Sequence, residues 1–299
     1  MSKKTLWAGL LSCSLAWTQP SQPHLTEGDA NFYSVDSQTL DIQVAHRTKI
    51  EWNEFSIAQG ETTRFIQPAP NSVVINQVTG LHSSDILGTL TANGQVYLIN
   101  PHGIFIGPDA LIQTAGFMAT TFDQLTLDEG DIPLHFKGDS RAAITHLGQI
   151  KTAGGQVTLV AAHIENLGTI EGQNITVVSA PEVWIKSDEK GVYLIPQVSI
   201  QQIEASRDPM EFVIKQEGLI RATGCVENQG RIYLVSSQST NINGRLEAAG
   251  GSVDVLGDRI LLQEKAFIDV SQIAKAGSIR VGGDYQGANP AIPNASHTT

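Results

Sequence analysis

The sequence has few of the features that mark the commonest protein classes. Its 299 residues include only two cysteines, and aromatic residues make up 6% and charged residues 16% of the chain. No window shows sustained apolar residues at the helical spacings of three and four, so a helical bundle is not expected. The net charge of −11 is spread along the chain and gives no basic surface for phosphates. We therefore expect no nucleic-acid partner.

The first residues have the composition of an export signal. Lys3 and Lys4 precede an apolar run from Leu6 to Leu15, which is far too short to cross a bilayer. Ser14 and Ala16 then place small residues where a signal peptidase cuts. We predict that residues 1–16 are a signal peptide and that the mature chain begins after Ala16.

The two cysteines allow no internal disulfide once the signal is removed. Cys13 would leave with the signal, and Cys225 would then be the only thiol. The residues before Cys13 also resemble a lipoprotein box faintly, so lipidation of Cys13 stays open as an alternative.

Glycine is abundant, with 28 residues, and short strands of alternating polarity recur between small-residue turns. The segment "GQIKTAGGQVTLV" from Gly148 returns in degenerate form downstream, at Gly168, Gly218, Gly244 and Ala266. A repeat of about 20 to 26 residues is typical of a β-solenoid, in which each coil buries its apolar face only by stacking on its neighbours. We predict an all-β solenoid with excursions at Asp128–Asp139 and Ser187–Pro209.

Four segments between Ile50 and Thr121 resemble a known family. They are "IEWNEFSIAQGETTRFIQP" from Ile50, "SVVINQVTG" from Ser72, "SDILGTLTANGQVYLINPHGIFIGPDA" from Ser84 and "GFMATT" from Gly116. In this order they look like the secretion domain, also called the haemagglutination activity domain, of two-partner-secretion exoproteins of the filamentous haemagglutinin type. The resemblance is looser from Gly148 to Gly287.

This resemblance implies a fold and a function. The fold is a right-handed, single-stranded parallel β-helix with an N-terminal cap and extra-helical hairpins. The function is that of an adhesin-like passenger without enzymatic activity or cofactor, which is secreted or held at the surface of a Gram-negative bacterium. Its partner is an outer-membrane β-barrel transporter with periplasmic POTRA domains, and host-surface or carbohydrate ligands are further candidates.

The resemblance also suggests how the chain is divided. After the signal we expect a cap at residues 17–50, because a solenoid end otherwise exposes its core and unpaired strand edges. The secretion domain would follow at 51–140, and further coils at 141–299. The chain stops soon after a repeat without a polar cap, so we expect a truncated or longer exoprotein.

Two short segments correspond to the family's secretion motifs. The first, NPNGI, stands here as Asn100, Pro101, His102, Gly103 and Ile104, with histidine in place of the second asparagine. Proline fixes φ and glycine accepts positive φ, so a tight turn is expected whose asparagine caps free backbone groups. The second motif, NPNL, is absent. Its place is taken by Asn76, Gln77, Val78, Thr79 and Gly80. Either segment could take part in secretion or only shape the solenoid.

Three further residues, Trp52, Asn53 and Phe55, match the family. We interpret Trp52 and Phe55 as packing residues of the core or cap. Because side chains alternate along a strand, the two are not expected to face the same way.

The alternative is a short secreted β-helix protein that binds carbohydrate or a host surface, or that cleaves a polysaccharide. An enzyme has to be considered because parallel β-helices also carry polysaccharide-cleaving sites. Asp254, Asp258 and Asp269 fall in adjacent predicted coils, with Arg259 and Arg280 nearby. Such a site needs carboxylates that converge on neighbouring coils. No second motif fixes their geometry, and no pair of histidines has the spacing of a zinc site. We therefore expect no enzyme and no metal.

Overall fold

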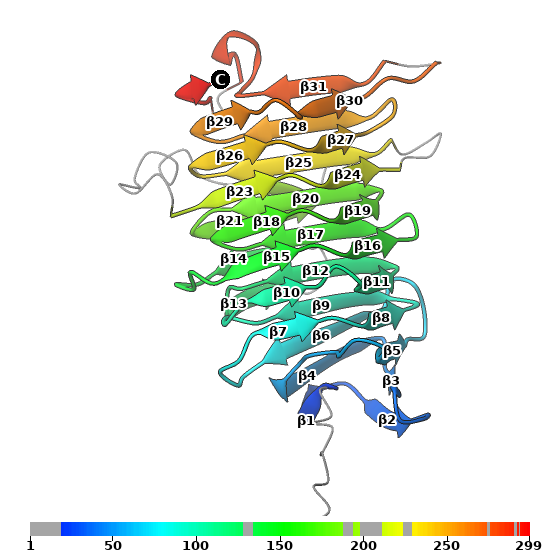
Figure 1. The fold of residues 1–299 in the computed structure, drawn as a ribbon. Helices are drawn as coiled ribbons and strands as arrows, with labels where there is room; N and C mark the ends of the chain where they lie inside the picture. The colour runs from blue at the N-terminus through cyan, green and yellow to red at the C-terminus, as the bar shows by residue number, and fades with distance from the viewer. Residues whose placement is uncertain are drawn as a thin grey trace, which may run out of the picture.

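The chain winds into a right-handed coil of short strands, shown from the N-terminal end at the bottom to the C-terminal end at the top in Figure 1. This computed structural model describes residues 19–127, 134–187, 194–197, 211–223, 229–273, 276–289, 292 and 294–299. The predicted signal peptide, Cys13 and Cys225 lie outside these ranges. The described residues contain no helix that is long and apolar enough to span a membrane.

After the first coil, which meets sheet C only through a single bridge at Ile57, the coils contribute strands to three sheets, which we call A, C and B in the order in which the chain visits them. Sheet A holds, in order, β1 (Ser21–Glu27), β4 (Arg47–Glu54), β6 (Val73–Val78), β9 (Gln95–Ile99), β12 (Gly116–Thr120), β17 (Gln156–Val160), β20 (Asn174–Ser179), β25 (Arg231–Ser236), β28 (Ser252–Leu256) and β31 (Ser278–Val281). Sheet C holds β7 (Ser84–Ile86), β10 (Ile104–Ile106), β15 (Ala143–His146), β18 (His163–Asn166), β23 (Val213–Gln216), β26 (Ser239–Ile242), β29 (Arg259–Leu262) and β32 (His297–Thr298). Sheet B holds β2 (Ala30–Ser34), β3 (Thr39–Val44), β5 (Thr62–Ile66), β8 (Thr89–Ala92), β11 (Leu111–Thr114), β16 (Gln149–Thr152), β19 (Thr169–Gly172), β24 (Leu219–Ala222), β27 (Arg245–Glu247) and β30 (Phe267–Asp269). A short 3-10 helix, η1 (Tyr285–Gly287), precedes β32.

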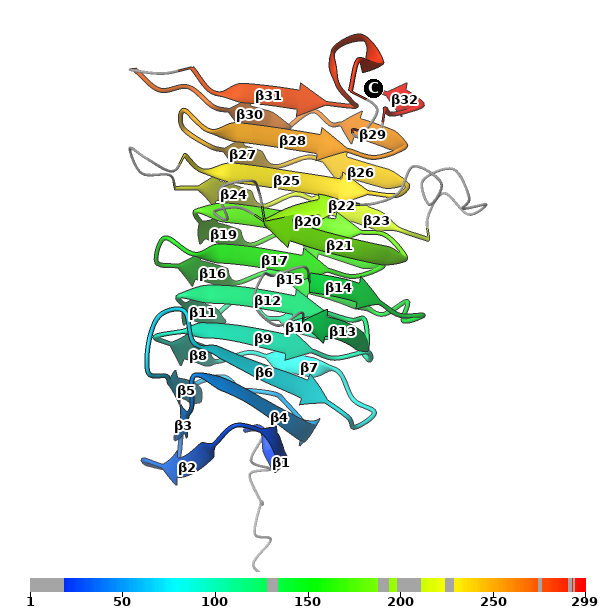
Figure 2. The same cartoon turned by 180° about the vertical axis from the view of Figure 1, so that it is seen from behind.

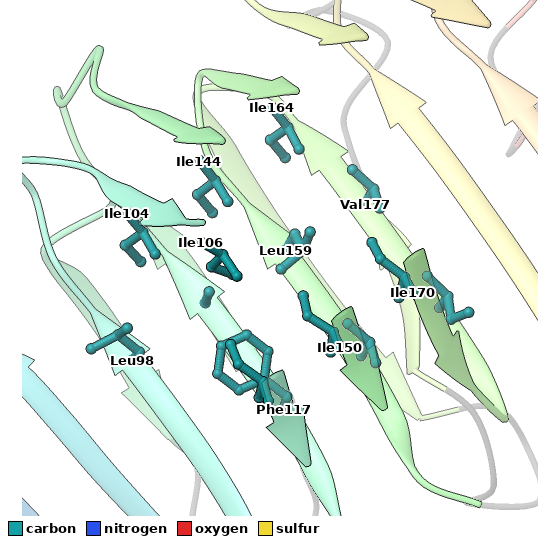
Figure 3. Close-up of a cluster of buried hydrophobic side chains, with 14 of the residues drawn as sticks. Leu98, Ile104, Ile106, Phe117, Ile144, Ile150, Leu159, Ile164, Ile170 and Val177 are labelled. Carbon is teal, nitrogen blue, oxygen red and sulfur yellow. The ribbon is translucent and has the colours of Figure 1, made fainter. Parts of the chain in front are cut away.

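From β3 onward the strands of these sheets pair in parallel, each with the strand one coil away. Residues in the same place of successive coils are direct partners, as Ile150 is with Ile170 in sheet B. Apolar residues at these places form stacks inside the coil, and Figure 3 shows several of their isoleucines pointing inward. The alternating sequence thus buries one side of every strand, and the expected all-β parallel β-helix is confirmed.

The N-terminal end is closed by two strands that run against the coil. β1 pairs antiparallel with β4, and β2 pairs antiparallel with β3. Phe32 of β2 packs edge-on against Trp52, with their ring centroids 5.9 Å apart. These strands cover the first coil, so the N-terminal cap expected as part of the fold is confirmed, whereas its bounds at residues 17–50 stay a prediction.

The expected extra-helical hairpins are also present, and together they form a fourth sheet. Sheet D consists of β13 (Gln124–Leu127), β14 (Leu134–Lys137), β21 (Glu182–Ser187) and β22 (Leu194–Gln197). The strands begin earlier than the sequence suggested, and residues 128–133, 188–193 and 198–210 of the predicted excursions lie outside the described residues. Sheet D lies on the outward face of sheet A (Figure 2), where Phe136 and Val183 bury Ile99 and Val160 in a second core.

Candidate functional site

Both motif segments lie at one corner of the coil, where the chain leaves sheet A and turns toward sheet C. The segment from Asn76 to Gly80 spans the end of β6, and Asn100 directly follows β9. Because β6 and β9 are parallel neighbours, Asn76 is the register partner of Leu98. The structure therefore brings the two segments together on successive coils, although Asn76 and Asn100 are 24 residues apart in the sequence (100 − 76).

Asn100 is fully buried, and its amide joins its own turn to the coil before it. Its Nδ2 donates to the carbonyl of His82 at 3.0 Å and to Oγ of Ser84 at 2.9 Å. Its Oδ1 accepts from the backbone N–H of His102 at 2.9 Å. The capping role expected for this amide is thus seen in the structure, and the partners show that it also links two coils.

The turn after Asn100 has the predicted conformation. The N–H of Gly103 donates to the carbonyl of Asn100 at 3.1 Å, and Gly103 has a φ of 111°, which favours glycine. Ser140 donates to the carbonyl of Pro101 at 2.6 Å, while the side chain of Ile104 enters the core. His102, which replaces the family's asparagine, is exposed.

Asn76 is a polar residue inside an otherwise apolar core. Its Oδ1 accepts from Nε1 of Trp52 at 3.0 Å, and its Nδ2 donates to the carbonyl of Tyr97 at 3.3 Å. Val78 beside it is buried in the same core. Burial also raises the pKa of Tyr97 to about 12. Asn76 therefore connects three successive coils through one amide.

Thr79 and Gly80 hold the loop after β6 against the end of β4. The backbone N–H and the hydroxyl of Thr79 both donate to the carbonyl of Trp52, at 2.8 and 3.1 Å. A Cβ on Gly80 would lie 2.0 Å from the carbonyl oxygen of Asn53, so only glycine allows this approach. The residues that matched the family at Trp52 and Asn53 thus lie directly under the second segment.

The expectation that Trp52 and Phe55 face different ways is wrong. Both are fully buried in the same core, with ring centroids 5.5 Å apart. The strand β4 ends at Glu54, so the chain turns before Phe55 and the alternation does not extend to it. Their interpretation as packing residues is confirmed by this burial.

The outer surface of the corner is formed by the loop between β6 and β7 and by the turn tip. Leu81 is 79% exposed, and His82 and His102 are exposed beside it. Nδ1 of His82 lies 2.8 Å from a carboxylate oxygen of Glu54. The corner therefore offers an exposed leucine and two histidines to solvent, while both motif asparagines are buried.

The carboxylates of the alternative enzyme site do not converge. Asp254 lies on sheet A and binds Arg280 at 3.0 Å, and burial raises its pKa although the arginine opposes that shift. Asp258 precedes β29 of sheet C and lies 3.8 Å from Arg259, whereas Asp269 ends β30 of sheet B. The three face different sides of the coil. Among the described residues, no group of three or more His, Cys, Asp or Glu side chains could hold a metal ion.

Sequence reasoning missed the residues that hold the motif asparagines in place. Ser84 and His82 precede Asn100 by 16 and 18 residues, and Ser140 lies 39 residues after Pro101. No local pattern marks such partners. Only an alignment of the coils could have found them, because each lies one coil away.

Comparison with known proteins agrees with this geometry. Residues 15–231 match the family model of the TPS secretion domain. A heme/hemopexin-binding protein of Haemophilus influenzae strain Rd is 29% identical over 209 residues, which is 68% of this chain and 23% of that protein. A second heme/hemopexin-binding protein of H. influenzae is 39% identical over 103 residues, which is 34% of this chain and 11% of that protein. The chain thus spans less than a quarter of the length of these relatives.

Two solved structures share the fold. The HMW1 secretion domain from H. influenzae superposes with a TM-score of 0.72 and 26% identity, and the match covers 94% of this chain and 81% of that one. The filamentous hemagglutinin secretion domain gives a TM-score of 0.50 at 14% identity, covering 86% of this chain and 99% of that one. The second likeness concerns the fold alone.

Proposed function

The chain belongs to the TPS secretion domain family, and from this premise we propose that it directs the export of a two-partner-secretion exoprotein through a dedicated outer-membrane transporter. The transporter's periplasmic POTRA domains bind the chain before it folds. The segments Asn76–Gly80 and Asn100–Ile104 are the parts of the chain that they recognise. The match over residues 15–231 carries this proposal.

Burial of the motif asparagines supports recognition of the unfolded chain. Asn76 and Asn100 are both 0% exposed, and their amides are occupied by contacts within the coil. A partner could reach these side chains only before the coil forms. An extended segment could instead add to a sheet edge of the partner, which uses backbone hydrogen bonds and alternate side chains.

Folding at the cell surface would then make export directional. Each coil buries its apolar stack only when it meets the coil before it, so folding can proceed stepwise as the chain emerges. Every added coil removes apolar area from water and opposes return of the chain. This step needs no nucleotide.

The exported product is an adhesin-like passenger at the surface of a Gram-negative bacterium, with no enzymatic activity. Asp254, Asp258 and Asp269 lie on three different sides of the coil, which supports the absence of enzymatic activity. Calcium-dependent cleavage of pectin that is lost on changing Asp254 would contradict it. Binding of heme or hemopexin is a second candidate, and it rests on the names of the two relatives alone.

A paired secretion and stability measurement tests the role of Asn100. The variant Asn100→Ile is compared with Asn166→Leu, which removes an equally buried, hydrogen-bonded amide from another part of the coil. Both should lose stability, because buried partners are left unpaired. Only Asn100→Ile should also reduce the amount of chain outside cells that express the transporter, beyond what its stability explains.

Two results would contradict the proposal. If both variants lose secretion in proportion to their unfolding midpoints, Asn100 acts through folding only. If purified POTRA domains bind the folded domain as well as the urea-unfolded chain, recognition does not require the unfolded state.

A further inference from the structure

The coil that follows the motif turn Asn100–Gly103 closes this turn through one serine. The hydroxyl of Ser140 donates to the carbonyl of Pro101 at 2.6 Å, and it accepts from the backbone N–H of Ala142 at 3.1 Å. A Cβ on Gly103 would lie 3.7 Å from the Cβ of Ala142, so this part of the chain lies directly against the turn. We call the segment Ser140–Ala142 the latch.

The latch comes late in the chain relative to the turn that it closes. Ile104, at the end of the motif segment, has Ser84 and Ile144 as register partners in the coils before and after it. Ser84 precedes Ile104 by 20 residues (104 − 84), whereas Ile144 follows it by 40 residues (144 − 104). The hairpin of β13 and β14 is inserted between β12 and β15 and accounts for the added length. The later side of the turn therefore stays open until this longer stretch of chain has arrived.

The hairpin also determines where the chain returns to the coil. Figure 2 shows β13 and β14 at the carboxyl end of β12. A Cβ on Gly138 would lie 3.1 Å from Cα of Phe122 and 2.9 Å from Oδ1 of Asp123, so the chain that leaves the hairpin passes close to the chain that enters it. Phe122 and Phe136 anchor both sides of the hairpin in the second core. Ser140 follows Gly138 by two residues and is thereby held at the turn.

We propose that closure of the latch ends recognition of the motif turn by the transporter. Before the hairpin forms, the carbonyl of Pro101 lacks its serine partner, the turn opens readily and Asn100 can be reached. Once Ser140 bonds to Pro101, the turn stays closed and the chain is released. Ser140 is a positioning residue that acts through the turn. This inference rests on the proposed function, because it concerns the regulation of the same recognition segment.

Hydrogen exchange on the folded full chain measures how often the turn opens. The N–H groups of His102 and Gly103 both donate to Asn100, so they exchange when the turn opens. Ser140→Ala removes one hydrogen bond and should make these two amides exchange about fivefold faster. The amides of β19 should exchange at the rate of the unchanged chain, which separates local opening of the turn from global unfolding.

Ser83→Ala is the matched control on the other side of the turn. A Cβ on Gly103 would lie 3.9 Å from the Cβ of Ser83, but the hydroxyl of Ser83 donates to Asp85 and not to the turn. This variant loses the same hydroxyl group at a similar place. Its exchange at His102 and Gly103 should equal that of the unchanged chain.

Binding to purified POTRA domains tests the link between the latch and recognition. Apparent affinity follows the fraction of chains in the binding-competent state, so folded Ser140→Ala should bind about fivefold more tightly than folded Ser83→Ala. The unfolded forms of the two variants should bind equally, because the latch is open in both.

The outcomes separate the latch from the proposed function. The latch is overturned if His102 and Gly103 exchange equally fast in the two variants, or if the two folded variants bind the POTRA domains equally. If the POTRA domains bind no unfolded chain at all, the proposed function fails, and the role of the latch in release fails with it.

Discussion

The indole nitrogen of Trp52 donates a hydrogen bond to the side-chain oxygen of Asn76 one coil away, at 3.0 Å, and both residues are completely buried. Asn76 therefore supplies the hydrogen-bond acceptor that the buried indole N–H of Trp52 needs. The pair anchors the first coil beneath the corner that carries the motif segments.

Replacing Asn76 by leucine should lower the free energy of unfolding by about 1–3 kcal/mol, because Trp52 Nε1 is left unpaired in the core. The same change in a Trp52→Phe background should cost less, since the indole donor is gone. Urea denaturation of the four proteins gives the coupling directly. Equal costs in both backgrounds would show that the hydrogen bond contributes nothing.

Gly80→Ala should be strongly destabilising, by about 2 kcal/mol or more, because the new Cβ would lie 2.0 Å from the carbonyl oxygen of Asn53. Gly154→Asn is the matched control. It has open space around the added Cβ and a φ of 71°, a conformation that asparagine tolerates, so it should cost under about 1 kcal/mol. Thermal unfolding compares the two. A similar loss in both would mean that the corner relaxes around Gly80.

Stability should fall as the pH is lowered from 6.5 toward 4, through His146. Its Nδ1 lies 2.6 Å from Asn166 Oδ1, and Asn166 uses its own N–H on Gln216, so the histidine must be the donor in that pair. Its Nε2 is buried without a partner, and burial lowers the pKa of His146 to about 4.

Lowering the pH destabilises the fold because the unfolded chain binds a proton on His146 more readily than the folded chain does. Below pH 6.5 the unfolded chain takes up a proton on this histidine, whereas the folded chain does so only near pH 4, so protons favour unfolding across that range. The loss should approach about 3 kcal/mol. Unfolding free energies at several pH values, compared with those of His146→Gln, isolate this contribution. Parallel pH profiles for the two proteins would disprove it.

Removing the cover of sheet D should destabilise sheet A. Phe136 is fully buried against the outward residues of that sheet, so Phe136→Ala should cost about 3–5 kcal/mol. Trp184→Ala, on the same sheet but 41% exposed, should cost much less. Chemical denaturation measures both. Equal and small effects would show that sheet D is only loosely attached to the coil.

The sequence by itself determined the coil. Strand alternation and the repeat from Gly148 onward specify which residues of each strand face inward, and a one-residue slip would expose every one of them. The conformation of the turn at Asn100–Gly103 was also determined by nearby residues, because proline fixes its own φ and glycine permits a positive φ. These features depend on residues close together in the chain.

Tertiary structure alone decided what the polar residues do. Trp52 finds Asn76, and Asn100 finds Ser84, only because successive coils stack in one register, and neither pair has a local signal. The inward turn of Phe55 depends on where β4 ends against its neighbours. Sheet D arises from segments that meet on the outer face of sheet A, where no repeat pattern governs the packing.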